Sequence, residues 1–263
     1  GTAGTDPAAR FRAMSFNLRV DQASDGDDAW THRTETAVSV IRLHEPDIVG
    51  CQELLAHQLA DLREALPAYE WVGEDRKAGD RPGEHVAIGY RTERFTLHDH
   101  DTFWLSETPD VPGSVGWDGY HPRIATWARL EDSVTDADLL HLNTHLDHHG
   151  ERARRRGASL LTGRLDTLAP DCPVLVTGDM NCQPGSPPYE RLTESLEDAR
   201  KVSTHGHHGP TDTFHGFTGA PEERIDYILV DDLAVRQHAT LADRWDDRYP
   251  SDHFPVLAEL VFE

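Results

Sequence analysis

The stretch Leu175-Val176-Thr177-Gly178-Asp179-Met180-Asn181 holds the clearest structural signal in this chain. Residues 173–177 predict a buried apolar strand, which a glycine ends and which a carboxylate and an amide follow at once. Because side chains alternate along extended backbone, Asp179 and Asn181 are expected to point the same way. Polar groups against a hydrophobic strand need partners, and a metal ion or a phosphate would supply them. A strand that simply ends in an Asx turn is the alternative.

Outward from this strand, apolar periodicity predicts alternating strands and helices. Helices are predicted over residues 30–44, 54–66, 151–168 and 189–196, and strands over 11–20, 47–51, 70–72, 85–91, 95–105, 123–130, 138–143, 225–230, 235–241 and 254–262. Loops are predicted over 21–28, 106–122 and 201–219. This order of elements favours a layered α/β fold over a strictly alternating parallel sheet. We expect a single domain over 11–263 after a disordered or cloning-derived tail over 1–10.

The charge balance is unusual, with 47 acidic residues against 25 lysines and arginines and a formal net charge of −22. Such an excess destabilises a compact chain in dilute buffer through self-repulsion, whereas high salt screens it. We therefore expect a halophilic protein, adapted to concentrated salt. The same acidity argues against the basic surface that most nucleic-acid-binding proteins use.

The cysteines and the hydropathy bear on location. Cys51, Cys172 and Cys182 form no CxxC pair, so thiols in a reducing, cytoplasmic compartment are expected, with a Cys172–Cys182 bridge as the alternative. The sequence has no apolar run of about 20 residues, as a membrane span needs, and no leader. A secreted form whose leader has been removed stays open. No motif for a protein partner is evident, and a monomer is expected.

Polar side chains recur at or near the strand ends: Asn17, Glu53, His145, Asp179, Asp226 and Asp252-His253. Each has an ordinary explanation alone, but layered α/β folds assemble their sites where strands end. Carboxylate and amide oxygens favour Mg²⁺ or Mn²⁺ over zinc. Two histidines could hydrogen-bond a phosphate or protonate a leaving oxygen, and a buried Asp226 would raise the pKa of a histidine beside it. These groups predict hydrolysis of a phosphoester by activated water.

Six segments, read in order, resemble one enzyme superfamily: FNLR (16–19), CQE (51–53), NTHLDH (143–148), VTGDMN (176–181), RIDYIL (224–229) and SDHFPV (251–256). They resemble the endonuclease/exonuclease/phosphatase superfamily, which includes deoxyribonuclease I, inositol polyphosphate 5-phosphatases and neutral sphingomyelinases. The resemblance covers residues 11–261. It implies a four-layer α/β sandwich, in which two mixed β-sheets pack face to face and are flanked by helices.

The resemblance also implies a role for each matched polar residue. Glu53 would be the principal metal ligand, assisted by Asn17 and Asp252. Asp179 would orient or deprotonate the attacking water, and Asn181 would hold a phosphate oxygen.

Further roles follow for the remaining matches. His253, paired with Asp226, would contact the scissile phosphate, and His145 would be the second catalytic histidine. Glu84 matches the glutamate that partners this histidine in the deoxyribonuclease I branch. Arg123 matches a phosphate-contacting arginine.

The resemblance favours a Mg²⁺- or Mn²⁺-dependent phosphodiesterase that hydrolyses nucleic acid, with DNA as the first choice. Trp117 and Tyr120 are the candidates for stacking on bases. A phosphomonoesterase or lipid phosphodiesterase of the inositol-phosphatase or sphingomyelinase type is the alternative, which the acidity makes more tenable. Three charged runs have weaker interpretations: residues 98–101 and 205–208 as metal motifs or solvated loops, and the arginines of 152–156 as a helix face or a phosphate-steering surface.

Overall fold

The structure is a computed structural model that describes residues 9–77 and 82–262. Most of the expected N-terminal tail lies outside the described residues, and the first strand begins at Arg10. The helices are η2 (Ala23–Asp28), α1 (Trp30–His44), α2 (Ala56–Ala65), α3 (Glu151–Leu168), α4 (Pro187–Thr193) and α5 (Ala199–Val202). The strands are β1 (Arg10–Asn17), β2 (Ile48–Leu54), β3 (Tyr69–Val72), β4 (His85–Arg91), β5 (Phe95–Trp104), β6 (Ile124–Asp132), β7 (Asp138–His145), β8 (Val174–Asp179), β9 (Glu197–Asp198), β10 (His207–His208), β11 (Asp226–Asp231), β12 (Leu233–Thr240) and β13 (Val256–Phe262).

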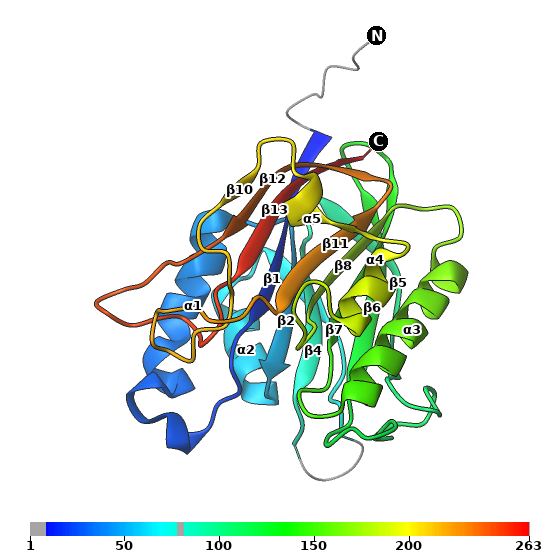
Figure 1. Cartoon of the computed structure of the whole chain (residues 1–263). Coiled ribbons are helices and arrows are strands. Elements are labelled where there is room, and N and C mark those ends of the chain that lie inside the picture. The colour runs from blue at the N-terminus through cyan, green and yellow to red at the C-terminus, as the bar shows by residue number, and fades with distance from the viewer. Residues whose placement is uncertain (1–8, 78–81, 263) are drawn as a thin grey trace.

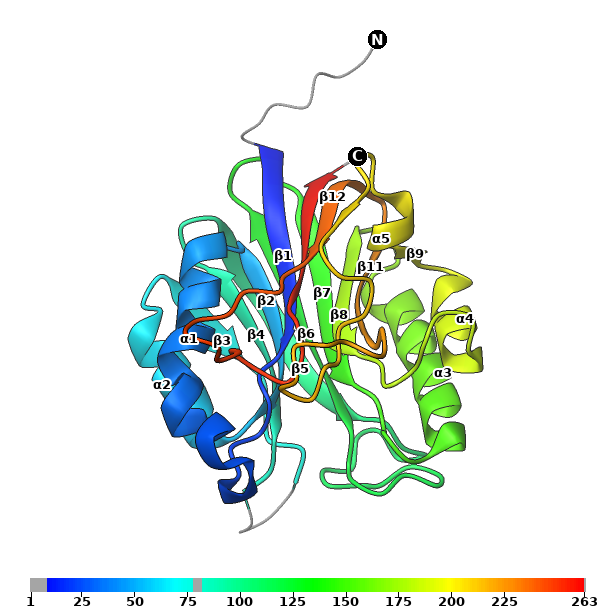
Figure 2. The ribbon, with the colours of Figure 1, turned by 60° about the vertical axis from the view of Figure 1, so that its left-hand side comes forward.

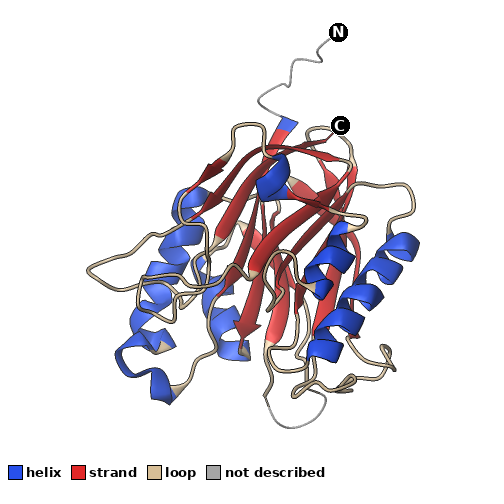
Figure 3. Cartoon of the chain, viewed as in Figure 1, coloured by secondary structure: helices blue, strands red, loops and turns tan. Residues whose placement is uncertain are grey.

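The strands form two mixed sheets (Figure 3). The seven-stranded sheet has the order β10-β12-β13-β1-β2-β4-β3, and the six-stranded sheet has the order β5-β6-β7-β8-β11-β9. Pairing is mostly antiparallel, but β1 runs parallel to β2, β7 runs parallel to β8, and the short β10 runs parallel to β12. Parallel neighbours deliver their carboxyl ends to the same edge, so each sheet brings two strand ends to one place.

The layers follow from the alternation of side chains along the strands. In β1, Phe11 and Ala13 belong to a core that joins both sheets, whereas Met14 and Phe16 belong to a core shared with α1 and α2. The outer face of the six-stranded sheet packs in the same way against α3 and α4. Figures 1 and 2 show the helix pairs on opposite outer faces. The predicted four-layer α/β sandwich is confirmed.

Toward one end of the inter-sheet layer the buried residues become polar. The Asn143 side chain donates to the carbonyl oxygens of Cys51 and Ala87, and its Oδ1 accepts from Gln52 and Thr177. The bonds to Cys51, Ala87 and Gln52 tie the six-stranded sheet to the seven-stranded sheet, and the bond from Thr177 lies within the six-stranded sheet. Every polar atom of this amide therefore has a partner, as a buried amide requires.

Gly50 allows the two sheets to approach this closely. A Cβ atom at that position would lie 2.0 Å from Thr177 Oγ1, well inside contact distance.

Several boundaries differ from the predictions. The second helix begins at Ala56, not Leu54, because β2 continues to Leu54. The helix predicted over residues 189–196 is α4, which begins two residues earlier at Pro187, a residue suited to a first helical turn. The predicted loops over 21–28 and 201–219 contain η2, the end of α5 and β10. All three cysteines are free, and no described helix has the length and apolarity needed to cross a membrane.

Candidate active site

Three neighbouring strands of the six-stranded sheet place His145, Asp179 and Asp226 side by side. His145 lies opposite Asp179 in the parallel β7–β8 pair, and Asp179 lies opposite Asp226 in the antiparallel β8–β11 pair. Asp226 shares the inward face with Ile228, because side chains alternate with a period of two. The inward-facing rows of the three strands thus end side by side in His145, Asp179 and Asp226.

The seven-stranded sheet contributes Asn17 and Glu53 from the facing side. A β-bulge between Cys51 and Leu54 and a left-handed Glu53 (φ 63°) interrupt the alternation of β2. A bulge re-aims a side chain, which explains how the Glu53 carboxylate reaches the inter-sheet side. Its Oε1 accepts a hydrogen bond from Asn17 Nδ2 at 3.0 Å, and its Oε2 accepts from the Val20 backbone.

Asn17 links the two sheets at this site. Its Nδ2 also donates to Asp179 Oδ2 at 2.9 Å, while its Oδ1 accepts from the backbone of Arg19. The amide nitrogen, not the oxygen, therefore faces the carboxylates. Asn17 is placed to hold Glu53 and Asp179, and the metal-ligand role that the resemblance implies for it stays a prediction.

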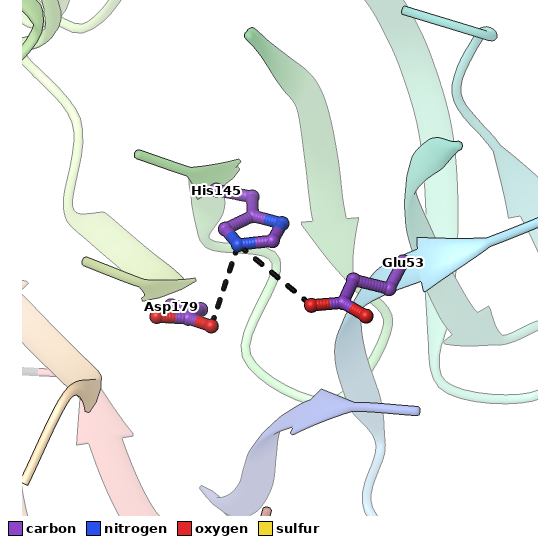
Figure 4. Close-up of side chains that lie close together, drawn as sticks. All are labelled: Glu53, His145 and Asp179. Atoms are coloured by element: carbon purple, nitrogen blue, oxygen red, sulfur yellow. Dashed lines mark ion pairs between the residues drawn. The ribbon is translucent and has the colours of Figure 1, made fainter. Parts of the chain in front are cut away.

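Figure 4 shows how Glu53, His145 and Asp179 converge. His145 Nε2 lies 3.4 Å from Asp179 Oδ2 and 4.0 Å from Glu53 Oε1. Burial lowers the pKa of His145 well below its ordinary value, and nearby Arg123 and Arg76 lower it further. His145 is therefore neutral near neutral pH.

His253 is the second histidine of the site, delivered by the segment before β13. Its Nδ1 lies 2.9 Å from Asp226 Oδ2, which also accepts from Thr213, and its Nε2 lies 3.8 Å from Asp179 Oδ2. Burial lowers the pKa of His253, but the carboxylates of Asp226 and Asp252 outweigh burial and hold it well above its ordinary value. His253 is therefore a cation at neutral pH.

Asp179 lies at the centre of these contacts. Burial raises the pKa of this carboxyl, and the charges of Asp226 and Glu53 raise it further, to about 7. Its Oδ1 accepts from the backbone N–H of Asn181, which is left-handed (φ 45°) and bonds Leu146 O through its side chain. The strand therefore ends in an Asx turn, so the two side chains do not continue one extended row. Both nevertheless line the same cleft.

This cleft of about 410 Å³ also contains cationic groups. Arg123 is buried, and its Nη2 donates to His148 Nδ1 at 2.8 Å. Its Nε lies 3.6 Å from Asp147, too far for a hydrogen bond, so Nε and Nη1 have no hydrogen-bond partner among the described residues. A buried guanidinium with unused donors is costly unless an acceptor completes it. Arg123 therefore has the chemistry of an anion-binding residue.

Glu84 corrects one expectation. Its Oε1 accepts from Arg76 Nη2 at 2.6 Å, and within the described chain it forms no ion pair with His145. Arg76 and Glu84 meet across neighbouring segments and satisfy each other, which removes the need for a histidine partner. Glu84 still lines the cleft.

Other sequence candidates lie elsewhere. Trp117 is half-buried and Tyr120 is exposed, and neither lines the cleft. Residues 98–101 lie on β5 and not on a loop; His98 pairs there with Glu131.

The donor set fits a hard divalent cation. One atom each of Glu53, His145 and Asp179 lies within 4.8 Å of the others. Asp252 lines the same cleft without belonging to this group of three; burial holds the pKa of its carboxyl above the ordinary value despite the opposing charge of His253. Such crowding of buried carboxylates is stabilised by a bound cation.

Arg76, His121 and His148 are cleft residues that sequence reasoning missed. No sequence motif surrounds Arg76. The one feature that could have drawn attention to it is that it is a basic residue outside the predicted strands and helices of a strongly acidic chain. His148 ends the segment NTHLDH, so its motif was visible although its role was not.

Comparison with known proteins places the site in context. A model of the Endonuclease/Exonuclease/phosphatase family matches residues 14–253. A protein of that family from Bacteroides vulgatus is 38% identical, with a TM-score of 0.92 over 97% of this chain and 99% of that chain. The mannosyl-6-phosphatase of Bacteroides thetaiotaomicron is 36% identical, with a TM-score of 0.91 over 96% of this chain and 100% of that chain. Two uncharacterised proteins of Acanthamoeba polyphaga mimivirus are 27% and 22% identical over 58% and 79% of this chain, which spans 59% and 36% of their lengths.

Proposed function

The chain belongs to the endonuclease/exonuclease/phosphatase family, and from this premise we propose that it is a divalent-metal-dependent hydrolase of phosphate monoesters. Arg123 carries the proposal, because it lines the cleft that also holds Asp179 and His253, and two nitrogens of its buried guanidinium have no hydrogen-bond partner among the described residues. A phosphate group would supply the acceptors that these nitrogens need. It would also balance the positive charge on His253.

The proposed cation is Mg²⁺ or Mn²⁺, since oxygen donors prevail in the site. Glu53 and Asp252 would hold it, with Asp179 beside them. When bound, the cation supplies positive charge to the phosphate oxygens.

The roles of the side chains follow from their protonation. Asp179, with a pKa of about 7, accepts a proton from the attacking water. His253, held as a cation by Asp226, donates a hydrogen bond to the phosphate as negative charge develops. Neutral His145 and Asn181 orient the reacting groups. The water oxygen bonds to phosphorus, the ester P–O bond breaks, and the alcohol leaves after taking one proton from solvent.

Monoesters are favoured over nucleic acid by two observations. The net charge of −22 opposes the approach of a long polyanion. A relative 36% identical over nearly all of this chain is a phosphatase of a mannosyl 6-phosphate. DNA hydrolysis, the first choice from the sequence, remains the second candidate because arginines of α3 border a hollow next to the cleft.

A substrate panel tests the proposal. We would compare p-nitrophenyl phosphate, mannose 6-phosphate, bis-p-nitrophenyl phosphate and linear DNA, with Mg²⁺, with Mn²⁺ and with EDTA. We expect metal-dependent hydrolysis that is fastest for the monoesters and absent in Asp179→Ala. Faster cleavage of DNA or of the diester would overturn the monoester assignment, and equal rates in EDTA would overturn the metal requirement.

A further inference from the structure

A second cavity adjoins the catalytic cleft. It has a volume of about 580 Å³ and shares Asn181, Glu223 and Ile225 with the cleft. Its walls come from the start of α3 and from the segment that leads into α4. Cavities of about 300–1,000 Å³ are typical of small-molecule sites. A substrate whose phosphate occupies the cleft can therefore extend past Asn181 into this space.

The walls of this cavity offer both hydrogen-bond donors and hydrogen-bond acceptors. The guanidinium groups of Arg152 and Arg155 form no hydrogen bond or ion pair with the described residues, although the chain is strongly acidic. Glu151 and Glu223 are exposed acceptors on the same wall, and the Gln183 side chain can donate and accept. These polar groups are free to meet a ligand.

Two other wall residues are already engaged. Asp118 accepts the backbone N–H groups of Arg152 and Ala153, and Arg154 donates to the carbonyl oxygen of Asp147. They fix the start of α3 and thereby the positions of the free side chains.

The mixture of groups identifies the class of ligand. A second phosphate accepts hydrogen bonds only, and Asp118 and Glu151, which line this cavity and not the catalytic cleft, would repel it. A nucleobase binds by stacking, and no aromatic side chain is among the residues that line the cavity. A hydroxyl group donates and accepts at once, so it matches arginine, glutamate and glutamine together.

We propose that this cavity binds the hydroxyl-rich part of a sugar or polyol phosphate while the catalytic cleft holds its phosphate. This inference rests on the proposed phosphomonoesterase function and names its class of substrate. Arg155 and Gln183 are the residues that recognise the hydroxyl groups. Neither contacts the phosphate-binding groups, because neither lines the catalytic cleft.

The test compares two monoesters in three proteins. The substrates are mannose 6-phosphate and p-nitrophenyl phosphate, which has no free hydroxyl on its leaving group. The proteins are the wild type, the double variant Arg155→Ala/Gln183→Ala, and the control Arg156→Ala, an adjacent arginine that does not line the cavity. Two lost hydrogen bonds should lower kcat/KM for the sugar phosphate by about tenfold or more and leave the aryl phosphate within about twofold.

The outcomes separate the two proposals. If the double variant loses both activities equally, or neither, the sugar site is refuted while phosphomonoesterase activity stands. If the wild type hydrolyses neither monoester, the proposed function fails. Binding can then be tested without turnover, by saturation-transfer NMR with mannose 6-phosphate. Sugar signals that persist in the double variant would overturn the sugar site. Sugar signals that are lost in the double variant but kept in Arg156→Ala would support it.

Discussion

Replacing Asp226 with asparagine should shift the whole pH profile of the enzyme toward acid. Asp226 Oδ2 lies 2.9 Å from His253 Nδ1 and also accepts a bond from Thr213 at 2.6 Å. Its negative charge raises the pKa of His253 and the pKa of Asp179. An amide keeps the shape but removes the charge, so both pKa values must fall.

The roles proposed for Asp179 and His253 determine how the rate changes on the acidic and the alkaline side of the pH profile. Wild-type activity should fall as the pH drops through the pKa of Asp179, about 7, because a protonated carboxyl cannot accept a proton. It should also fall as the pH rises through the elevated pKa of His253, because the cation is lost. In Asp226→Asn both limbs move to lower pH. At a pH above the lowered pKa of His253 the variant lacks the cation, which typically costs about 10²–10³-fold in rate.

The assay is kcat/KM for p-nitrophenyl phosphate with Mg²⁺ between about pH 5 and pH 10. The matched control is Asp198→Asn, a buried carboxylate that pairs with Arg224 at 2.7 and 2.8 Å and does not line the cleft. The control should lose about 1.5–3 kcal/mol of stability and keep its pH profile. An Asp226→Asn enzyme with unmoved limbs and a rate within about threefold of wild type would refute the reasoning.

Three further perturbations test the fold. Gly50→Ala would place a Cβ 2.0 Å from Thr177 Oγ1, and should cost about 1–3 kcal/mol in urea unfolding; an unchanged midpoint would contradict this packing. Burial lowers the pKa of His141 and of His238 to about 3, so the unfolded chain binds more protons below about pH 6.5. Stability should therefore fall by about 1.4 kcal/mol per pH unit for each histidine as the pH drops from about 6.5, and His141→Gln should have a shallower slope. Molar KCl should raise the melting temperature because it screens the net charge of −22, whereas equal stability without salt would contradict halophilic adaptation.

The row formed by His145, Asp179 and Asp226 could be predicted from the sequence, because the alternation of side chains along the strands determines it. His145, Asp179 and Asp226 each end an inward-facing row of a predicted strand, and parallel or antiparallel pairing then brings them together. The resemblance added His253, whose partner is Asp226 as expected. Local pattern and family motif agreed at these positions.

Other features depended on tertiary contacts that no local pattern records. The β-bulge in β2 interrupts the regular alternation of side chains. Without it, strand periodicity would place the Glu53 side chain on the face of the sheet that packs against α1 and α2. Glu84 pairs with Arg76, from a loop without a motif, and not with His145. The hollow beside α3 arises where four separated segments meet, and its lining has no spacing that could reveal it.

The hydrogen bonds of the Asn143 side chain limit which parts of the enzyme can change during evolution. This side chain cross-links the two sheets beside the candidate site, so hinge bending between the sheets would break three buried hydrogen bonds at once. The residues of the candidate site are therefore held by a rigid pair of sheets, and only the loops around the cleft are free to vary. New specificities in this lineage should arise by exchanging loop residues such as Gln183 while the sheets are inherited unchanged.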